Sequence, residues 1–293
     1  MVVGCKNTKI FLIFASIYVV FHRNLLILHP KQCKNMIEPK LHYYNIHQDV
    51  IAFSSTRQGG YSKGLYGEFN INRYCGDCQE AIQQNREALC QFLKIDDRHL
   101  LMPHQVHLTE ISVIDEAFMQ LSDNNRQEKL EGVDALMTNL PGVCIGVSTA
   151  DCIPILLYDQ KRCACCAIHA GWRGTVKRIA EKAVQRMVDV YGSEPPDLIA
   201  QIGPGISLDS FEVGNEVYEA FAEAGFDMAK ISCKKQKSHI DLPMCNFLQL
   251  TASGVPANQI SVSQICTFKQ HDTYFSARRL GINSGRIYTA IML

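Results

Sequence analysis

The chain has 293 residues, 47% of them hydrophobic and 20% charged, and its 29 Lys and Arg residues balance 29 Asp and Glu residues. This composition is typical of a folded globular protein and excludes a largely disordered one. Because the formal net charge is zero, the chain has no basic excess of the kind that binds nucleic acid. We therefore expect a folded protein with no nucleic-acid partner.

The first 35 residues differ in pattern from the rest. Lys6 and Lys9 precede an apolar run at residues 10–21, an order that is typical of a signal peptide. No small-residue cleavage motif follows, and the run is shorter than the ~20 residues that a membrane-spanning helix needs. A third interpretation, which we favour, is that translation begins at Met36. We therefore expect a single domain over residues 36–293, with residues 1–35 outside the fold and no association with a membrane.

The 13 cysteines agree with a reducing, cytoplasmic location. Cys144 and the run Cys163–Cys166 lie in apolar, strand-like segments, where free cysteine serves as a small hydrophobic residue. The single C-x-x-C motif, Cys75 and Cys78, has no second pair, so we interpret it as incidental and not as a zinc ribbon.

The predicted elements after the N-terminal segment alternate irregularly between strands and helices. A Gly-rich loop is predicted at residues 57–70, and the helix at 79–94 repeats Ile82, Leu89 and Phe92 near a period of 3.6. Strands are predicted at 49–56, 106–115, 135–140, 143–150, 153–159, 163–170, 197–203 and 285–293, and further helices at 175–191, 212–225 and 243–254. Consecutive strands with interspersed helices favour a mixed α/β fold, a single-domain layered sandwich of mixed β-sheets flanked by helices, over a doubly wound parallel fold.

Three short segments carry side chains that bind metals. They hold His104 and His107, then Asp151 and Cys152, and finally His169. Imidazole and thiolate are preferred zinc ligands, and a catalytic zinc keeps three protein ligands with a fourth position open to water. Residues three apart in a strand point to opposite faces, so one of the first two histidines is expected to be structural. The spacing also allows a purely structural interpretation, in which each histidine is only hydrogen-bonded and binds no metal.

Two arginines are candidates for binding an anion. Arg57 precedes two glycines, so a guanidinium and backbone N–H groups would meet a phosphate there. Arg173 lies near the expected start of a helix, where exposed N–H groups also favour anions. A surface arginine beside a flexible turn is the alternative for each.

Taken together, these segments resemble the YfiH-type laccase-domain family. The matching motifs, in the family's order, are "TRQGGYSKGLYGEFNI", "HQVH", "GVDALMTN", "GVSTADCIPILL", "AIHAGWRGT", "IGPGIS" and "CTFKQHDTYFSARRLGINSGR". The resemblance covers residues 40 to 293 and implies a fold like that of YfiH and the cysteine-dependent deamidating toxins. Two departures are Leu108, where the family has Gly, and Cys78, where it has Asp.

The resemblance implies a zinc site formed by His107, Cys152 and His169, with copper as a second possibility that the lack of paired H-x-H motifs argues against. It also implies phosphorolysis of adenosine, inosine, guanosine and methylthioadenosine, and deamination of adenosine, so the partners are purine nucleosides and phosphate. Cys152 and His169 are then catalytic, Asp151 is a candidate for proton transfer, and Arg57 and Arg173 are candidate phosphate or ribose contacts.

Three alternatives stay open. The first is a metal-free amide hydrolase with Cys152 as nucleophile and His169 as base, for which editing of peptidoglycan precursors is one proposal. The second is the copper-dependent polyphenol oxidase that the family was first named for. The third is a zinc- or copper-binding protein without turnover.

Overall fold

A computed structural model describes residues 37–293, which form one compact unit. The expected N-terminal extension, residues 1–35, lies outside the described residues. Within the described part of the chain, no helix combines the length and the apolar character needed to cross a bilayer.

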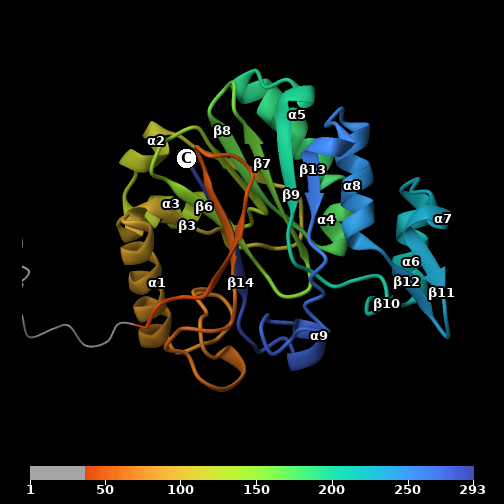
Figure 1. Cartoon of the computed structure of the whole chain (residues 1–293), viewed down its shortest axis with the longest axis horizontal. Coiled ribbons are helices and arrows are strands. Elements are labelled where there is room, and N and C mark those ends of the chain that lie inside the picture. The colour runs from red at the N-terminus through yellow and green to blue at the C-terminus, as the bar shows by residue number, and fades with distance from the viewer. Residues whose placement is uncertain (1–36) are drawn as a thin grey trace, which may run out of the picture. The chain divides into compact units, whose positions relative to one another are not determined.

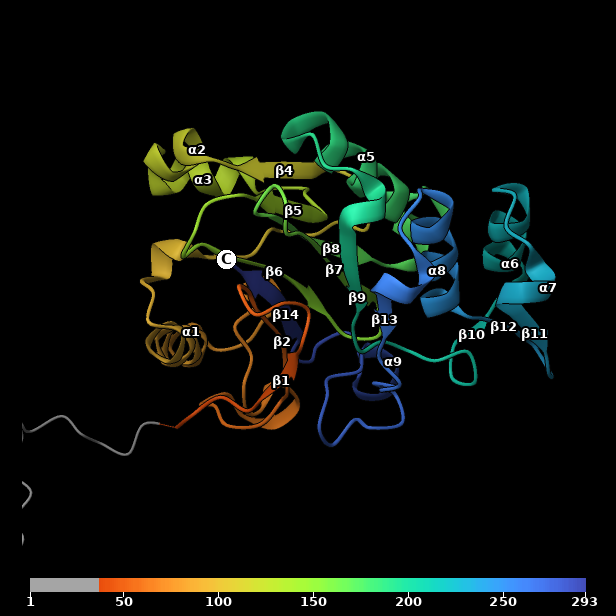
Figure 2. The same ribbon diagram turned by 45° about the horizontal axis from the view of Figure 1, so that its top comes forward.

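Two mixed sheets form the centre of the fold (Figures 1 and 2). The first sheet runs in the order β1 (Leu41–Tyr44), β2 (Ile51–Ser55), β14 (Ile287–Met292), β6 (Cys144–Thr149) and β3 (Leu100–Leu101). The second runs in the order β13 (Ile260–Val262), β9 (Leu198–Ile202), β7 (Ile153–Asp159), β8 (Ala164–Ala170), β5 (Ala135–Thr138) and β4 (Ile111–Ile114). In the first sheet the edge strand β3 pairs parallel with β6, and in the second sheet both edge strands, β13 and β4, pair parallel with their neighbours. The other strands pair antiparallel, which confirms the mixed α/β fold class.

The helices of residues 37–293 lie around the two sheets, with α6 (Asn215–Glu223) and α7 (Met228–Ile231) beside a small third sheet. The others are α1 (Gln79–Leu93), α2 (Glu116–Gln120), α3 (Asp123–Lys129), α4 (Trp172–Val176), α5 (Ile179–Tyr191), α8 (Leu242–Ala252) and α9 (Ala277–Leu280). Figures 1 and 2 place α1 on the side of the first sheet and α5 and α8 on the side of the second. A small sheet of β10 (Glu212–Val213), β12 (Ser238–Ile240) and β11 (Ser232–Lys234) lies beside α6.

The alternation of side chains along β8 explains the layers. Cys166 and Ile168 pack with the helices of the second sheet, whereas Cys165 and Ala167 pack with residues of the first sheet. Successive residues of a strand point to opposite faces, so both faces of β8 are buried and its sequence is continuously apolar. His169 shares the face of Cys165 and Ala167, so it projects into the layer between the sheets at the end of the strand.

Four predicted elements differ from the structure. The strand predicted at 106–115 is limited to β4, and the helix predicted at 175–191 is divided into α4 and α5. The division occurs at Arg178, which adopts the left-handed conformation (φ 65°) and donates from Nη2 to the carbonyl of Ala224 at 2.6 Å. A left-handed residue interrupts the helical hydrogen-bond ladder.

Two further differences concern the predicted helices at 212–225 and 79–94. The segment 212–225 begins with β10 before α6 starts at Asn215. In α1, Ile82 and Leu89 are buried as expected, but Phe92 is 37% exposed, and Leu93 packs in the core instead.

Candidate functional site: a histidine–cysteine–histidine centre

His107, Cys152 and His169 meet at one end of the two sheets. One nitrogen or sulfur atom from each lies within 4.8 Å of the others, and this is the single such group of metal-binding side chains in residues 37–293. Pro154 of β7 pairs with His169 of β8, so Cys152, two residues before Pro154, lies at the end of β8. Two imidazoles and a thiolate in this arrangement fit a zinc ion, which such donors hold in tetrahedral sites.

Asp134 positions two of the three donors although it is not itself a donor. Its Oδ1 accepts a hydrogen bond from Nδ1 of His169 at 2.7 Å and one from the backbone N–H of His107 at 3.0 Å. Its Oδ2 accepts the backbone N–H groups of Val106 at 3.3 Å and Leu108 at 2.7 Å. The carboxylate therefore leaves Nε2 of His169 free for a ligand and fixes the turn that carries His107.

These hydrogen bonds explain why the strand predicted at 106–115 starts late. The N–H groups of residues 106–108 are directed at one carboxylate and are not available to a neighbouring strand. His107 consequently has a φ of 63°, in the left-handed region. Neither His104 nor His107 lies in a strand of the sheet. The prediction that they point to opposite faces of one strand was therefore wrong.

Gly171 leaves room for the three side chains to converge. A Cβ atom at this position would lie 2.9 Å from Cδ2 of His107 and 3.1 Å from Sγ of Cys152. Any larger residue would push both donors outward. The glycine after "HA" is therefore required by close approach, not by an unusual backbone angle.

The charges of Cys152 and His169 are coupled. Burial opposes ionisation of Cys152, but the positive charge of His169 and hydrogen bonds from both histidines outweigh it and lower the thiol pKa to about 6. Burial also opposes protonation of His169, but the thiolate and the Asp134 hydrogen bond raise its pKa to about 9. Without a metal ion, the pair is a thiolate and an imidazolium near neutral pH.

A cavity of about 190 Å³ opens above this centre. His104 lines it and stacks on Tyr74, with ring centroids 4.2 Å apart and an interplanar angle of 22°. Nδ1 of His104 also lies 2.6 Å from a carboxylate oxygen of Glu131. His104 thus contributes to the wall of the cavity and not to the group of metal-binding atoms.

Asp151 is held by other contacts. Its Oδ1 accepts from Oγ1 of Thr267 at 2.7 Å, and its Oδ2 accepts from the backbone N–H of Arg278 at 2.7 Å. It does not belong to the lining of the cavity. The geometry indicates that Asp151 ties the segment around α9 to Cys152, and its role in proton transfer stays a prediction.

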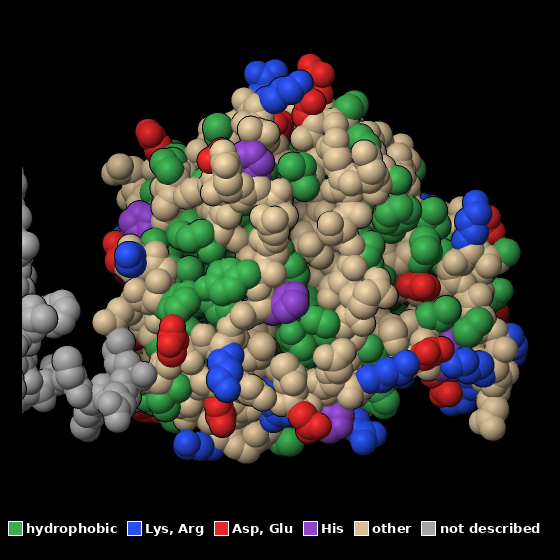
Figure 3. Space-filling model, in the orientation of Figure 1, with side chains coloured by type: hydrophobic (Ala, Val, Ile, Leu, Met, Phe, Trp, Pro, Cys, Tyr) green, Lys and Arg blue, Asp and Glu red, His purple; other side chains and the backbone are tan. Residues whose placement is uncertain are grey.

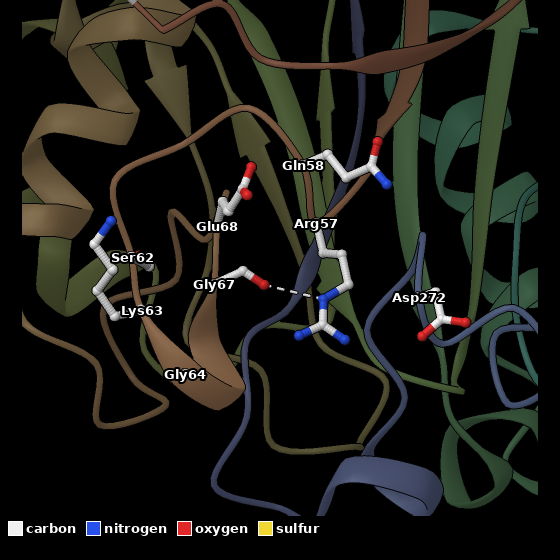
Figure 4. Close-up of a pocket in the computed structure, with 8 residues that line it drawn as sticks. All are labelled: Arg57, Gln58, Ser62, Lys63, Gly64, Gly67, Glu68 and Asp272. Carbon is white, nitrogen blue, oxygen red and sulfur yellow. Dashed lines mark hydrogen bonds between the residues drawn. The ribbon is translucent and has the colours of Figure 1, made fainter.

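Arg57 lies in a separate groove, shown in Figure 4. Its Nε donates to the carbonyl of Gly67 at 3.0 Å and its Nη1 donates to the carbonyl of His271 at 2.7 Å, while the guanidinium packs over Phe275. The carboxylates of Glu68 and Asp272 line the same groove. These contacts join two loops, and the structure does not bring Arg57 to the three-donor centre.

Arg173 is exposed and belongs to α4, as its position in the motif predicted. Its guanidinium lies over the ring of Trp172, 4.3 Å from the centroid. Arg173 is absent from the lining of the cavity, so its phosphate role also stays a prediction.

Several residues of the site were not identified from the sequence. They include Asp134, Tyr74 and Arg286, of which the last two line the cavity. Asp134 lies within the motif "GVDALMTN", directly before the buried strand β5, and a carboxylate at such a position is expected to be paired if it is buried. Arg286 is half-buried and donates from Nη1 to Ser284 and from Nη2 to Ile282.

Part of the cavity wall is built from polar residues that bond one another. Gln105 donates to the carbonyl of Ser148 at 2.8 Å and accepts from its N–H at 2.7 Å, which attaches the segment before His107 to the end of β6. Asn72 donates to Oγ of Ser148 at 2.6 Å and accepts from the N–H of Tyr74. The aromatic ring and the metal-binding turn are therefore fixed to the same strand end.

Two known enzymes are similar to this chain over most of its length. The purine nucleoside phosphorylase of Bacteroides thetaiotaomicron is 48% identical over 250 residues, which are 84% of this chain and 93% of that protein. Adenosine deaminase RL5, from an unknown prokaryotic organism, is 44% identical over 260 residues, 87% of this chain and 99% of that protein.

The same fold occurs in the crystal structure of the hypothetical protein YfiH of Bacillus licheniformis. It is 27% identical, has a TM-score of 0.81 and covers 87% of this chain and 97% of its own. The family model described as multi-copper polyphenol oxidoreductase laccase matches residues 51–293. The chain therefore belongs to this laccase-domain family.

Proposed function

We propose that the protein is a zinc-dependent purine nucleoside enzyme. It would carry out phosphorolysis of adenosine, inosine, guanosine and methylthioadenosine and deamination of adenosine. The observation that carries the proposal is the convergence of His107, Cys152 and His169 at the base of a cavity with an aromatic wall. The names of two relatives, a purine nucleoside phosphorylase and an adenosine deaminase, support the substrate class.

The donor set fits zinc by its chemistry. Two imidazoles and a thiolate serve one ion, and Asp134 orients His169 in the carboxylate–histidine arrangement common at metal centres. When bound, zinc would supply Lewis acidity and lower the pKa of a water molecule. Copper would accept the same donors, but three donors that serve one ion do not make the several copper sites of a multicopper oxidase.

The chain's own residues would bind and orient the nucleoside. The ring of Tyr74, held flat against His104, offers a stacking surface of the kind that purines use. Arg286 holds its guanidinium at the cavity through bonds to backbone carbonyls and supplies positive charge for phosphate. Cys152 and His169 would lie closest to the reacting atoms, and Asp134 would keep the proton of His169 on Nδ1.

Turnover of nucleosides by the full-length protein tests this proposal. Adenosine and inosine are incubated with and without phosphate, before and after removal of metal by a chelator, and the products are separated by chromatography. We expect inosine from adenosine without phosphate, free base only with phosphate, and loss of both reactions on chelation with recovery on adding zinc. No turnover of any nucleoside by the zinc-loaded protein would contradict the proposal.

A metal-free amide hydrolase is a second candidate, favoured by one observation. Cys152, His169 and Asp134 form a thiolate–imidazolium–carboxylate series, the order found in cysteine hydrolases. Amide hydrolysis that survives complete metal removal and stops on alkylation of Cys152 would select it. Stoichiometric metal without turnover of nucleosides or amides would instead indicate a metal-binding protein.

A further inference from the structure

A second cavity, of about 550 Å³, lies beside the first, and Tyr74 lines both. It is formed by α1, the short 3-10 helix at residues 97–99, β3 and α3. The charged side chains that line it are Arg73, Arg86, Arg98, Arg126, Asp97 and Asp123. Four guanidinium groups therefore face two carboxylates, which leaves the cavity with an excess of positive charge.

Arg126 is one of the two buried cations of this cavity, 6% exposed beside Arg86 at 5%. Its Nη1 donates to the carbonyl of Arg98 at 3.0 Å and its Nη2 to the carbonyl of Met119, while Nε is buried without a partner. Among the ion pairs of residues 37–293, none includes Arg126. A buried charge without a counter-ion is unfavourable, so an anion in this cavity would be stabilised.

The other three arginines share the two carboxylates. Asp97 lies 2.7 Å from Nε of Arg86 and 3.5 Å from Nη2 of Arg73. Asp123 lies 2.9 Å from Nη1 of Arg98 and is largely exposed. Arg73 and Arg98 are about half-exposed at the rim, so their guanidinium groups can turn toward a ligand without unfolding the site.

Neighbouring arginines in the cavity repel one another, so a bound anion would be favourable there. Burial lowers the pKa of Arg126, and the charge of Arg98 lowers it further. Burial and the charge of Arg86 act in the same way on the pKa of Arg73. An anion between the two pairs would offset both repulsions.

We propose that this arginine-lined cavity binds a phosphoryl group, either as free phosphate or as part of a small molecule such as a nucleotide. Guanidinium groups form paired N–H contacts with phosphate oxygens, which explains why arginine and not lysine lines the cavity. The amides of Gln79, Asn124 and Gln127 lie in the same lining and can donate to the remaining oxygens. The site is distinct from the three-donor centre and touches its cavity only through Tyr74.

Calorimetric titration of the full-length protein with inorganic phosphate, pyrophosphate and ADP tests the proposal. To separate this site from the metal centre, the titrations use the chelator-treated Cys152→Ala variant as background. We expect binding that weakens with added salt and that falls roughly tenfold or more in the Arg73→Gln/Arg98→Gln double variant. Arg186→Gln removes an exposed charge from α5, outside the cavity, and should leave the affinity unchanged.

The same titrations distinguish the two sources of the phosphoryl group. Similar affinities for pyrophosphate and ADP would assign a free anion, whereas a clear preference for ADP would assign a nucleotide. Hydrogen exchange should show protection of residues 97–102 and 121–130 on binding. Equal affinity in the double variant and its background, or protection confined to the segments of His107 and His169, would overturn the proposal.

Arg126→Met tests the buried arginine that has no carboxylate partner. It should abolish binding in a protein that circular dichroism shows to be folded, and if it does not fold, the double variant carries the test alone. None of these measurements uses nucleoside turnover, so their failure is distinguishable from a failure of the proposed function.

Discussion

The three-donor centre and the groove around Arg57 are both lined by polar residues, yet they differ in what those residues contact. In the groove, the guanidinium of Arg57 bonds the carbonyl of Gly67 (Figure 4). It also bonds the carbonyl of His271 and packs on Phe275. At the centre, Nδ1 of His169 is bonded to Asp134, and its other nitrogen is directed at Cys152 and His107. The side chain of Arg57 is thus directed at the backbone of two loops, whereas the donor atoms of the centre are directed at one another.

The largest expected effect comes from Asp134. Asp134→Asn removes the negative charge and replaces one of the two acceptor oxygens by an NH2 group, so it cannot accept from both His169 and the turn at His107 as the carboxylate does. We therefore expect metal affinity to fall about 10- to 100-fold. Competition with a chromogenic chelator measures this affinity. An unchanged affinity would show that the donors are positioned without Asp134.

Gly171→Ala should have a smaller effect on the same centre. The added methyl group would contact His107 and Cys152, and we expect roughly tenfold weaker metal binding with little change in the thermal midpoint of the metal-free protein. If the midpoint falls but the metal affinity does not, the glycine serves the fold and not the centre.

Three arginine variants sharpen the comparison between the centre and the groove. Arg286→Gln should raise the KM for phosphate roughly tenfold. Arg57→Gln should lower the free energy of unfolding by ~1–3 kcal/mol, because the part-buried carbonyls of Gly67 and His271 lose their donor. A raised KM for phosphate in Arg57→Gln or Arg173→Gln, but not in Arg286→Gln, would instead favour the phosphate roles predicted from the sequence.

The smallest perturbation is a change of pH. In the metal-free protein, Cys152 should be alkylated with a midpoint near pH 6, because its thiolate persists down to its lowered pKa of about 6. The thiolate–imidazolium pair should exist up to about pH 9, where His169 loses its proton. Mass spectrometry of the Cys152 peptide measures the rate, and a midpoint near 9, as in an ordinary thiol, would contradict the coupling.

Much of the fold followed from apolar patterns. The strands β5 to β9 and β14 are buried, so continuous apolar runs located them within one or two residues. The short, partly exposed elements β1, β11 and α9 were missed, because two to four residues do not establish a period. The division of the helix at Arg178 was also missed, since it depends on contacts with distant residues.

The site was less accessible to sequence reasoning. The motifs pointed to His107, Cys152 and His169, and the structure brings these three together. The spacing of His104 and His107 predicted that only one of them belongs to the metal-binding group, and only His107 does. The reason was wrong, because Asp134 accepts the N–H groups of residues 106–108 and this segment is a loop and not a strand. Tyr74 and Arg286 reach the cavity only through the fold, so no local pattern indicated them.

The quantity of metal bound to the protein tests the central claim most directly. Native mass spectrometry of the full-length protein, reconstituted with zinc, should show one ion per chain. Cys152→Ala and His107→Ala should each show none, whereas Cys78→Ser, a change at an exposed cysteine outside the centre, should retain one ion. A wild-type protein without bound zinc, or a Cys152→Ala protein that keeps a full equivalent, would contradict the account.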